Sequence, residues 1–74
     1  MKLKNPPELF DVVELLVNLP EYDRQMGEQG TIVECYNDRD FEIEFANDRG
    51  ETTGLCTLSR NQFIVVWKSN TQQM

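Results

Sequence analysis

Phe41-Glu42-Ile43-Glu44-Phe45 alternates strictly between apolar and acidic side chains, which is the period of a strand with one buried face. It follows a glycine-framed segment, Gly27-Glu28-Gln29-Gly30-Thr31-Ile32-Val33-Glu34, that runs from a turn into β-branched residues. Glycine is favoured in such a frame because one or both positions need a positive φ or a close backbone approach. Together the two segments predict the central hairpin of a small, twisted antiparallel sheet.

Further strands are expected on both sides of this hairpin. Residues 9–19 carry apolar side chains at both helical and strand spacing, and their three valines favour a strand. A single helical turn at residues 7–10 is compatible with that strand. The polar residues 20–29 predict a long loop folded over one end of the sheet. The other expected elements are strands over 31–36, 41–46, 51–58 and 63–67, hairpin turns over 37–40 and 47–50, and a 3₁₀ turn over 59–62.

The order of these elements predicts an all-β fold, a small five-stranded SH3-like barrel with a short 3₁₀ turn before the last strand. Its expected parts are an irregular N-terminal arm over 1–8, the barrel over 9–67 and a polar C-terminal tail over 68–74. The last strand, 63–67, is apolar on both faces, as expected for a strand that is covered on both sides or closes a barrel. The predicted core comprises Val13, Leu15, Val33, Phe41, Ile43, Phe45, Leu58 and Ile64.

The chain is short and acidic. Its 74 residues form one domain near the lower limit for a self-sufficient core, so association with a copy of itself or with another protein would bury useful surface. Thirteen acidic and seven basic residues give a formal net charge of −6. That charge disfavours nucleic acid and anionic membranes, which both repel an acidic surface, and it steers a basic protein partner toward the domain.

The sequence shows no pattern typical of a catalytic or zinc-binding site. There is no histidine to shuttle protons, and Cys35 and Cys56 lie in expected strands without an obvious base, which favours inert core thiols. Two cysteines without histidine cannot fill a closed zinc site. Glu42 and Glu44 share one strand face and are expected to form a solvated surface. We therefore expect no enzyme activity, no cofactor and no metal.

Nothing in the sequence directs the chain to a membrane or out of the cell. Lys2 and Lys4 are followed by Asn5-Pro6-Pro7-Glu8, where the apolar part of a signal peptide would have to lie. The longest apolar segment, residues 12–19, is interrupted by polar residues and is too short to span a bilayer. We expect a cytoplasmic protein with reduced thiols.

Five residues are candidates for contacts with a partner: Tyr22, Asp23 and Arg24 in the long loop, together with Tyr36 and Trp67. Peptide-binding SH3 domains use an acidic long loop and an aromatic-lined groove to hold polyproline helices. The Ala-Leu-Tyr-Asp-Tyr motif and the paired tryptophans of that family are absent here. Trp67 also suits simple packing at the open end of the barrel.

The Gly27-x-x-Gly30 spacing lacks the helix and the lysine that follow in a phosphate-binding loop, so it indicates turn geometry. Its rhythm resembles that of KOW modules, which are small barrels that contact RNA. Those modules carry a basic surface, whereas this chain is acidic.

Five short motifs are spread along the chain: Asp11-Val12-Val13-Glu14-Leu15-Leu16, Leu19-Pro20-Glu21-Tyr22, Gly27-x-x-Gly30-Thr31-Ile32-Val33-Glu34, Phe41-Glu42-Ile43-Glu44-Phe45 and Thr57-Leu58. In these motifs the chain resembles an uncharacterised bacterial family of short proteins, common in cyanobacteria and described only as a domain of unknown function. The resemblance covers about residues 10–66 and implies an SH3-like barrel without catalytic residues. Similar barrels serve as protein-docking parts in the nitrile hydratase β subunit and in small photosynthetic electron-transfer subunits, and members of such families often sit beside toxin-like genes.

The predicted function is a non-catalytic protein-interaction module, acting as a small acidic subunit or an antitoxin-like partner of another protein, alone or as a homodimer. An SH3-type peptide-groove binder is the alternative, and a KOW-like RNA-contacting barrel is the more distant one. A concave aromatic slot beside the long loop would favour the groove, whereas a flat apolar patch would favour docking.

Overall fold

The computed structural model describes residues 6–69, and its later strands lie within two residues of the predicted ones. The expected strand within residues 9–19 is confirmed but short, and residues 8–11 before it form one turn in which the Asp11 N–H donates to the Glu8 carbonyl (3.1 Å). Residues 1–5 and 70–74, most of the predicted arm and tail, lie outside the described residues. The elements are β1 (Val12–Leu15), η1 (Pro20–Tyr22), β2 (Gln29–Cys35), β3 (Asp40–Ala46), β4 (Thr52–Ser59), η2 (Arg60–Gln62) and β5 (Phe63–Trp67), where η marks a 3₁₀ turn.

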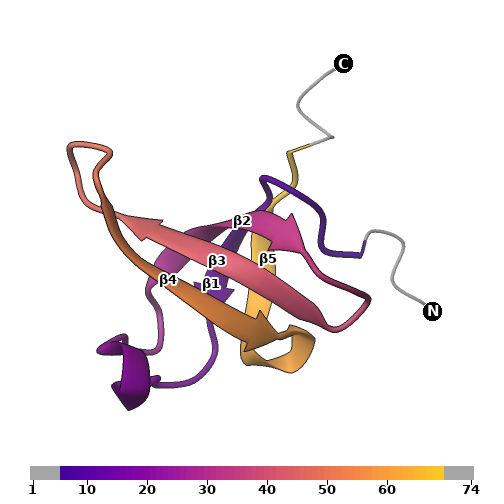
Figure 1. Cartoon of the computed structure of the whole chain (residues 1–74), viewed down its shortest axis with the longest axis horizontal. Helices are drawn as coiled ribbons and strands as arrows, with labels where there is room; N and C mark the ends of the chain where they lie inside the picture. Colours follow the sequence, from indigo (N-terminus) through magenta and orange to yellow (C-terminus); the bar gives the residue numbers. More distant parts are fainter. Residues whose placement is uncertain (1–5, 70–74) are drawn as a thin grey trace.

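The five strands form one antiparallel sheet in the order β4-β3-β2-β1-β5. This confirms the predicted all-β class, the strand succession and the 3₁₀ turn before the last strand. The sheet curls but does not close into a barrel, because within residues 6–69 no ladder joins β4 to β5. The short η2 turn links these two outer strands, and they diverge from it at a large angle (Figure 1).

The core fills the concave face of the curled sheet. Ladder registers place Ile32, Ile43 and Cys56 in one row across β2, β3 and β4, and all three are buried. The Phe41 ring meets the Phe63 ring edge to face, with centroids 5.6 Å apart. Each fully buried side chain of this size stabilises the fold by about 1.5–3 kcal/mol. Six of the predicted core residues are buried as expected: Val13, Leu15, Phe41, Ile43, Phe45 and Leu58.

The other two predicted core residues, Val33 and Ile64, are not in the core. The β2–β3 register shifts between Ile32 and Glu34, so Val33 is an extra residue in a bulge and Ile32 takes the buried place. In β5, Phe63 is buried and Val65 packs against the core, so the intervening Ile64 points outward and is 52% exposed. The expectation that both faces of this strand are covered is therefore wrong: its outer face is open.

The two glycines that frame the long loop are needed for different reasons. Gly27 has a φ of +94°, which β-carbon-bearing residues rarely adopt. Gly30 lies on β2 close against β3, its neighbour in the sheet. An added Cβ would come within 2.7 Å of the Ile43 Cγ2 and 2.8 Å of the Glu44 carbonyl oxygen. Both predicted reasons, positive φ and close backbone approach, are confirmed, one at each glycine.

The Gly30→Ala variant is expected to lose about 2–3 kcal/mol of unfolding free energy, in the upper part of the range for overpacking, because the added Cβ meets backbone that cannot turn aside. Gly27→Ala is the matched control, with a loss of about 1 kcal/mol from backbone strain and no steric conflict within 4 Å. Urea denaturation of both variants measures the difference. Equal losses, or a smaller loss at Gly30, would contradict the close approach of β2 and β3.

Candidate functional site

The structure does not bring the five predicted contact residues together. Tyr22 ends the η1 turn and Asp23 follows it with left-handed backbone (φ 59°), at the end of the sheet where β5 begins. Trp67 lies at the other end of β5, level with Thr31 of β2, because both residues pair with Val12 of β1. Tyr36 lies five residues beyond Thr31, about 15 Å along the strand direction. These positions form no aromatic slot beside the long loop.

Arg24 is a structural anchor of the long loop. Its Nη1 donates to Glu28 Oε1 (3.0 Å), and its Nη2 donates to the Thr53 carbonyl (2.9 Å) and hydroxyl (3.1 Å). The guanidinium stacks over the Phe45 ring at 4.7 Å and occupies the space that a side chain at Gly54 would need. Arg24 thus pins the long loop onto β3 and β4.

Tyr36 belongs to a hydrogen-bonded acidic surface on the outer face of β3. Its hydroxyl donates to Glu42 Oε1 (3.1 Å), and this bond raises the pKa of Tyr36. Glu42 also accepts from the Thr57 hydroxyl (2.8 Å), and Glu44 accepts from the hydroxyl of Thr52. The two glutamates lie outside the core, as the alternation predicts.

A buried carboxylate at the start of β1 was missed by the sequence reasoning. Asp11 is fully buried, and its Oδ2 accepts from Lys68 Nζ (2.7 Å) and from the Glu8 amide (2.9 Å). Its Oδ1 accepts from the Ser69 amide (2.9 Å) and hydroxyl (3.2 Å). This one side chain ties the segment before β1 to the segment after β5. The sequence contains a signal for this burial. Side chains two positions apart in a strand lie on the same face, so Asp11 shares the face of Val13, a predicted core residue.

Burial alone would raise the pKa of Asp11, but the hydrogen bonds from Lys68 and from the Ser69 and Glu8 amides outweigh it. The pKa of Asp11 is therefore below its usual value, and the group is a carboxylate at neutral pH. Because the charge is fully partnered, this cluster is a structural clasp and not a site for substrate.

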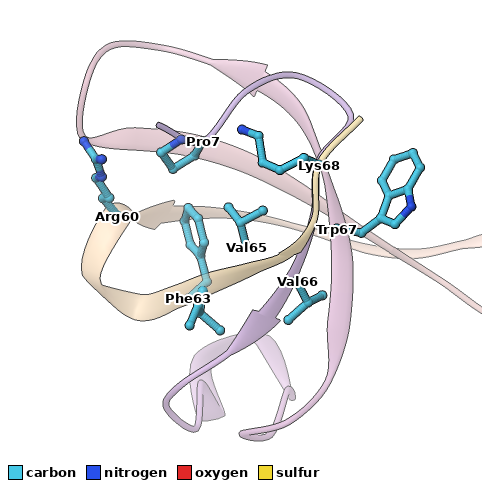
Figure 2. Close-up of a pocket in the computed structure, with 8 residues that line it drawn as sticks. Pro7, Arg60, Phe63, Val65, Val66, Trp67 and Lys68 are labelled. Carbon is cyan, nitrogen blue, oxygen red and sulfur yellow. The ribbon is translucent and has the colours of Figure 1, made fainter. Parts of the chain in front are cut away.

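The most exposed apolar surface of the sheet lies on β5. Ile64, Val66 and Trp67 are 52%, 47% and 43% exposed on the side of the strand that faces away from the core. A groove of about 450 Å³ runs along β5, lined by all five residues of the strand and bounded by Pro7, Arg60 and Lys68. Figure 2 shows Phe63, Val65 and Pro7 around this hollow and Val66 and Trp67 pointing away from it. The strand thus offers apolar contacts on both sides.

The backbone of β5 also has a free edge. It pairs with β1 on one side and with no other strand within residues 6–69. The Leu16 amide donates to the Gln62 carbonyl (2.9 Å), so the backbone groups of Gln62 face β1. Along a strand, the backbone N–H and C=O groups of successive residues point alternately to its two edges. Phe63 and Val65 therefore direct their N–H and C=O groups to the free edge.

The other edge of the sheet is protected. β4 carries Thr52, Thr53 and Thr57, and the Arg24 side chain covers the Thr53 carbonyl (2.9 Å). Natural sheets blunt their edges with such polar and charged groups, since unpaired strands otherwise recruit another chain. Neither β4 nor β5 has a charged residue or a proline along its length. Among the described residues, β5 exposes three large apolar side chains and β4 exposes one, Leu55, so β5 is the more apolar of the two edge strands.

The cysteines are poor nucleophiles in this setting. Burial raises the pKa of both the Cys35 and the Cys56 thiol, so both stay protonated at neutral pH. They lie on β2 and β4 with β3 between them, about 10 Å or more apart, which is too far for a disulfide. Among the described residues, no three cysteine or acidic side chains converge in a way that could hold a metal ion.

Fold and surface together define a class, an all-β domain with one curled, open five-stranded sheet and an apolar outer strand. The chain belongs to the family described as Domain of unknown function (DUF4926), whose family model matches residues 9–65. This confirms the expected membership of a family of unknown function. No curated protein matches the chain, and no solved structure matches it. Within residues 6–69, the structure has no helix with the length and apolar character needed to cross a membrane.

Proposed function

We propose that this domain is a non-catalytic protein-interaction module that docks on another protein through β5. The observation that carries the proposal is the exposure of Ile64, Val66 and Trp67 on a strand whose other edge is unpaired among the described residues. Exposed apolar patches on small domains mark interaction sites, and aromatic residues such as Trp67 often supply most of the affinity. In the cell, the domain would act as a small acidic subunit or an antitoxin-like partner, in a bacterial cytoplasm.

The charge distribution supports a protein partner over nucleic acid. Four glutamates cover the outer face near the centre of the sheet and would steer a basic partner toward β5. Arg24 is engaged by the loop, and Arg39 and Arg49 flank opposite ends of β3, about 20 Å apart. Arg60 lies beside Arg39, because its amide donates to the Arg39 carbonyl (2.8 Å), and Asp38 and Asp40 line the same hollow. A phosphate backbone would meet one pair of neighbouring cations, flanked by two aspartates, in an acidic field. The outer-face glutamates are Glu14, Glu34, Glu42 and Glu44.

The SH3-type alternative receives less support from the geometry. The hollow beside the long loop is lined by polar and charged residues with no aromatic side chain: Asn18, Pro20, Asp23, Arg24 and Gln25. Polyproline grooves need stacked aromatic rings at that place. Docking through a flat apolar strand accounts for the exposed side chains more directly.

A pull-down from the native cell with wild type, Trp67→Ala and Tyr22→Ala tests this function. We expect a specific partner to be retained by wild type and by Tyr22→Ala, and its recovery to fall at least tenfold with Trp67→Ala, since a hot-spot truncation costs about 2 kcal/mol. The two exposed aromatics lie at opposite ends of the sheet, so Tyr22→Ala controls for general stickiness. Absence of any specific partner, or equal loss with both variants, would contradict docking through β5.

A further inference from the structure

We propose that the free edge of β5 receives an extended segment of the partner protein as an added antiparallel strand, and that this segment carries a carboxylate at the end that meets Arg60. The proposal rests on the docking function above and specifies what occupies the docking surface.

The backbone of β5 is suited to pairing with another strand. Phe63 and Val65 turn their N–H and C=O groups away from β1, so an incoming strand finds two residues with both groups available. The groove beside them is lined by apolar atoms of Phe63 and Val65, which can take side chains at alternate positions of the incoming segment. Main-chain hydrogen bonds then supply affinity, and the groove supplies side-chain selection.

The charges at the two ends of the groove differ. Lys68, at the end of β5, is held by Asp11 (2.7 Å) and Glu8 (3.4 Å). Arg60, at the start of β5, lines the groove, and its side chain makes no ion pair with any of residues 6–69. No carboxylate lines this groove. Arg60 also lines a second hollow with Asp38 and Asp40, but it forms no ion pair with either aspartate. The groove therefore favours a carboxylate at the Arg60 end.

The proposed antiparallel direction decides which end of the segment meets Arg60. An added strand that runs antiparallel to β5 brings its own C-terminal end beside Phe63 and Arg60. The partner segment is thus extended, apolar at alternate positions and acidic at its C-terminal end.

A second copy of this chain fits the edge less well. If two β5 strands pair so that the outward groups of Phe63 and Val65 meet, Ile64 lies on the two-fold axis. Neither copy then offers a strand carboxylate to Arg60 of the other, because β5 contains no aspartate or glutamate. A five-residue strand is also only about 17 Å long, which is short for a stable dimer but sufficient for a bound segment.

The test uses the full chain, isotope-labelled for NMR, and two blocked synthetic peptides. One peptide is Thr-Val-Thr-Val-Thr-Val-Asp, and the other replaces its final Asp by Lys. We expect the Kd of the acidic peptide to be about fivefold lower than that of the basic peptide, since one partly exposed ion pair contributes about this factor to affinity. Arg60→Glu should reverse this preference. Arg49→Glu, an equal charge change in the β3–β4 turn, should leave the preference of wild type intact.

Two further peptides carry N-methyl groups on alternate residues of the acidic sequence. One peptide is methylated at the amides that would face β5, and the other at the amides that would face away from it. Strand addition predicts that the first methylated set abolishes binding and that the second has little effect, because only one edge of the peptide pairs with β5. Amide exchange at Phe63 and Val65 should slow when the peptide binds.

Three outcomes would overturn the proposal: no binding of the acidic peptide below millimolar concentration, equal affinity of the acidic and basic peptides, or equal tolerance of the two methylated sets. A dimer in solution that dissociates in Ile64→Lys would also overturn it, by assigning the edge to a second copy. If these results appear while the Trp67-dependent pull-down succeeds, strand addition fails and the docking function stands.

Discussion

The Phe45→Ala variant is expected to be largely unfolded at room temperature. Phe45 is buried at the centre of the concave face, and its ring supports the guanidinium of Arg24, which holds the long loop. Truncating a buried phenylalanine costs about 3–5 kcal/mol. A core of this size supplies about the same net stability, so the loss removes most of it. Circular dichroism and urea denaturation measure the change.

Tyr36→Ala is the matched control for this variant, since it also removes an aromatic ring but from a site that is mostly exposed. It should change the unfolding free energy by no more than about 1 kcal/mol, including its bond to Glu42. A folded Phe45→Ala protein that loses less than about 1 kcal/mol would show that the core is not organised around β3.

The Asp11→Asn variant is expected to lose about 3 kcal/mol of unfolding free energy at neutral pH, because breaking a buried ion pair leaves Lys68 without its main counter-charge. The amide also places a donor where the carboxylate accepted bonds from Lys68 Nζ and the Glu8 amide. The ends of the chain around Pro6 and Ser69 should loosen in the variant.

The same carboxylate predicts how stability depends on pH. The pKa of Asp11 is lowered in the folded state, so its stabilisation is complete above the unfolded value, near pH 4, and is lost as the pH falls through the folded pKa. Wild type should lose stability steeply below about pH 4, and Asp11→Asn should lack the part of this loss that comes from Asp11. Glu28, whose pKa is lowered by the hydrogen bonds from the Gln25 amide and from Arg24, contributes equally in both proteins. Asp48→Asn, in the exposed β3–β4 turn, is the control with an unchanged acid profile. Parallel acid profiles of wild type and Asp11→Asn would contradict the clasp.

Much of the fold follows from local patterns. The alternation over residues 41–45 fixes both the strand and its buried face, and Asn37 and Asn47 close their turns with side-chain acceptors, as the turn chemistry predicts. The bulge at Val33 does not follow from the sequence, because the pairing register with β3 decides which of two adjacent β-branched residues faces the core.

The site was harder to predict than the fold. The sequence predicts Arg24 and Trp67 as contact residues. The position of the Arg24 side chain depends on the space at Gly54, thirty positions along the chain. Apolar residues on both faces of β5 predicted a covered strand, whereas the open sheet leaves one face and one edge exposed. Whether a sheet closes depends on how its outer strands diverge, which no local pattern encodes.

The central claim is that partners dock on β5, and site-specific photo-crosslinking in the native cell tests it most directly. Val66 and Leu55 are matched positions, since both are exposed aliphatic residues on the outer strands of the sheet, one on β5 and one on β4. A photoreactive phenylalanine analogue at position 66 is predicted to yield a discrete protein adduct, and the same group at position 55 none. Adducts of equal yield from both positions, or an adduct from position 55 alone, would contradict the claim.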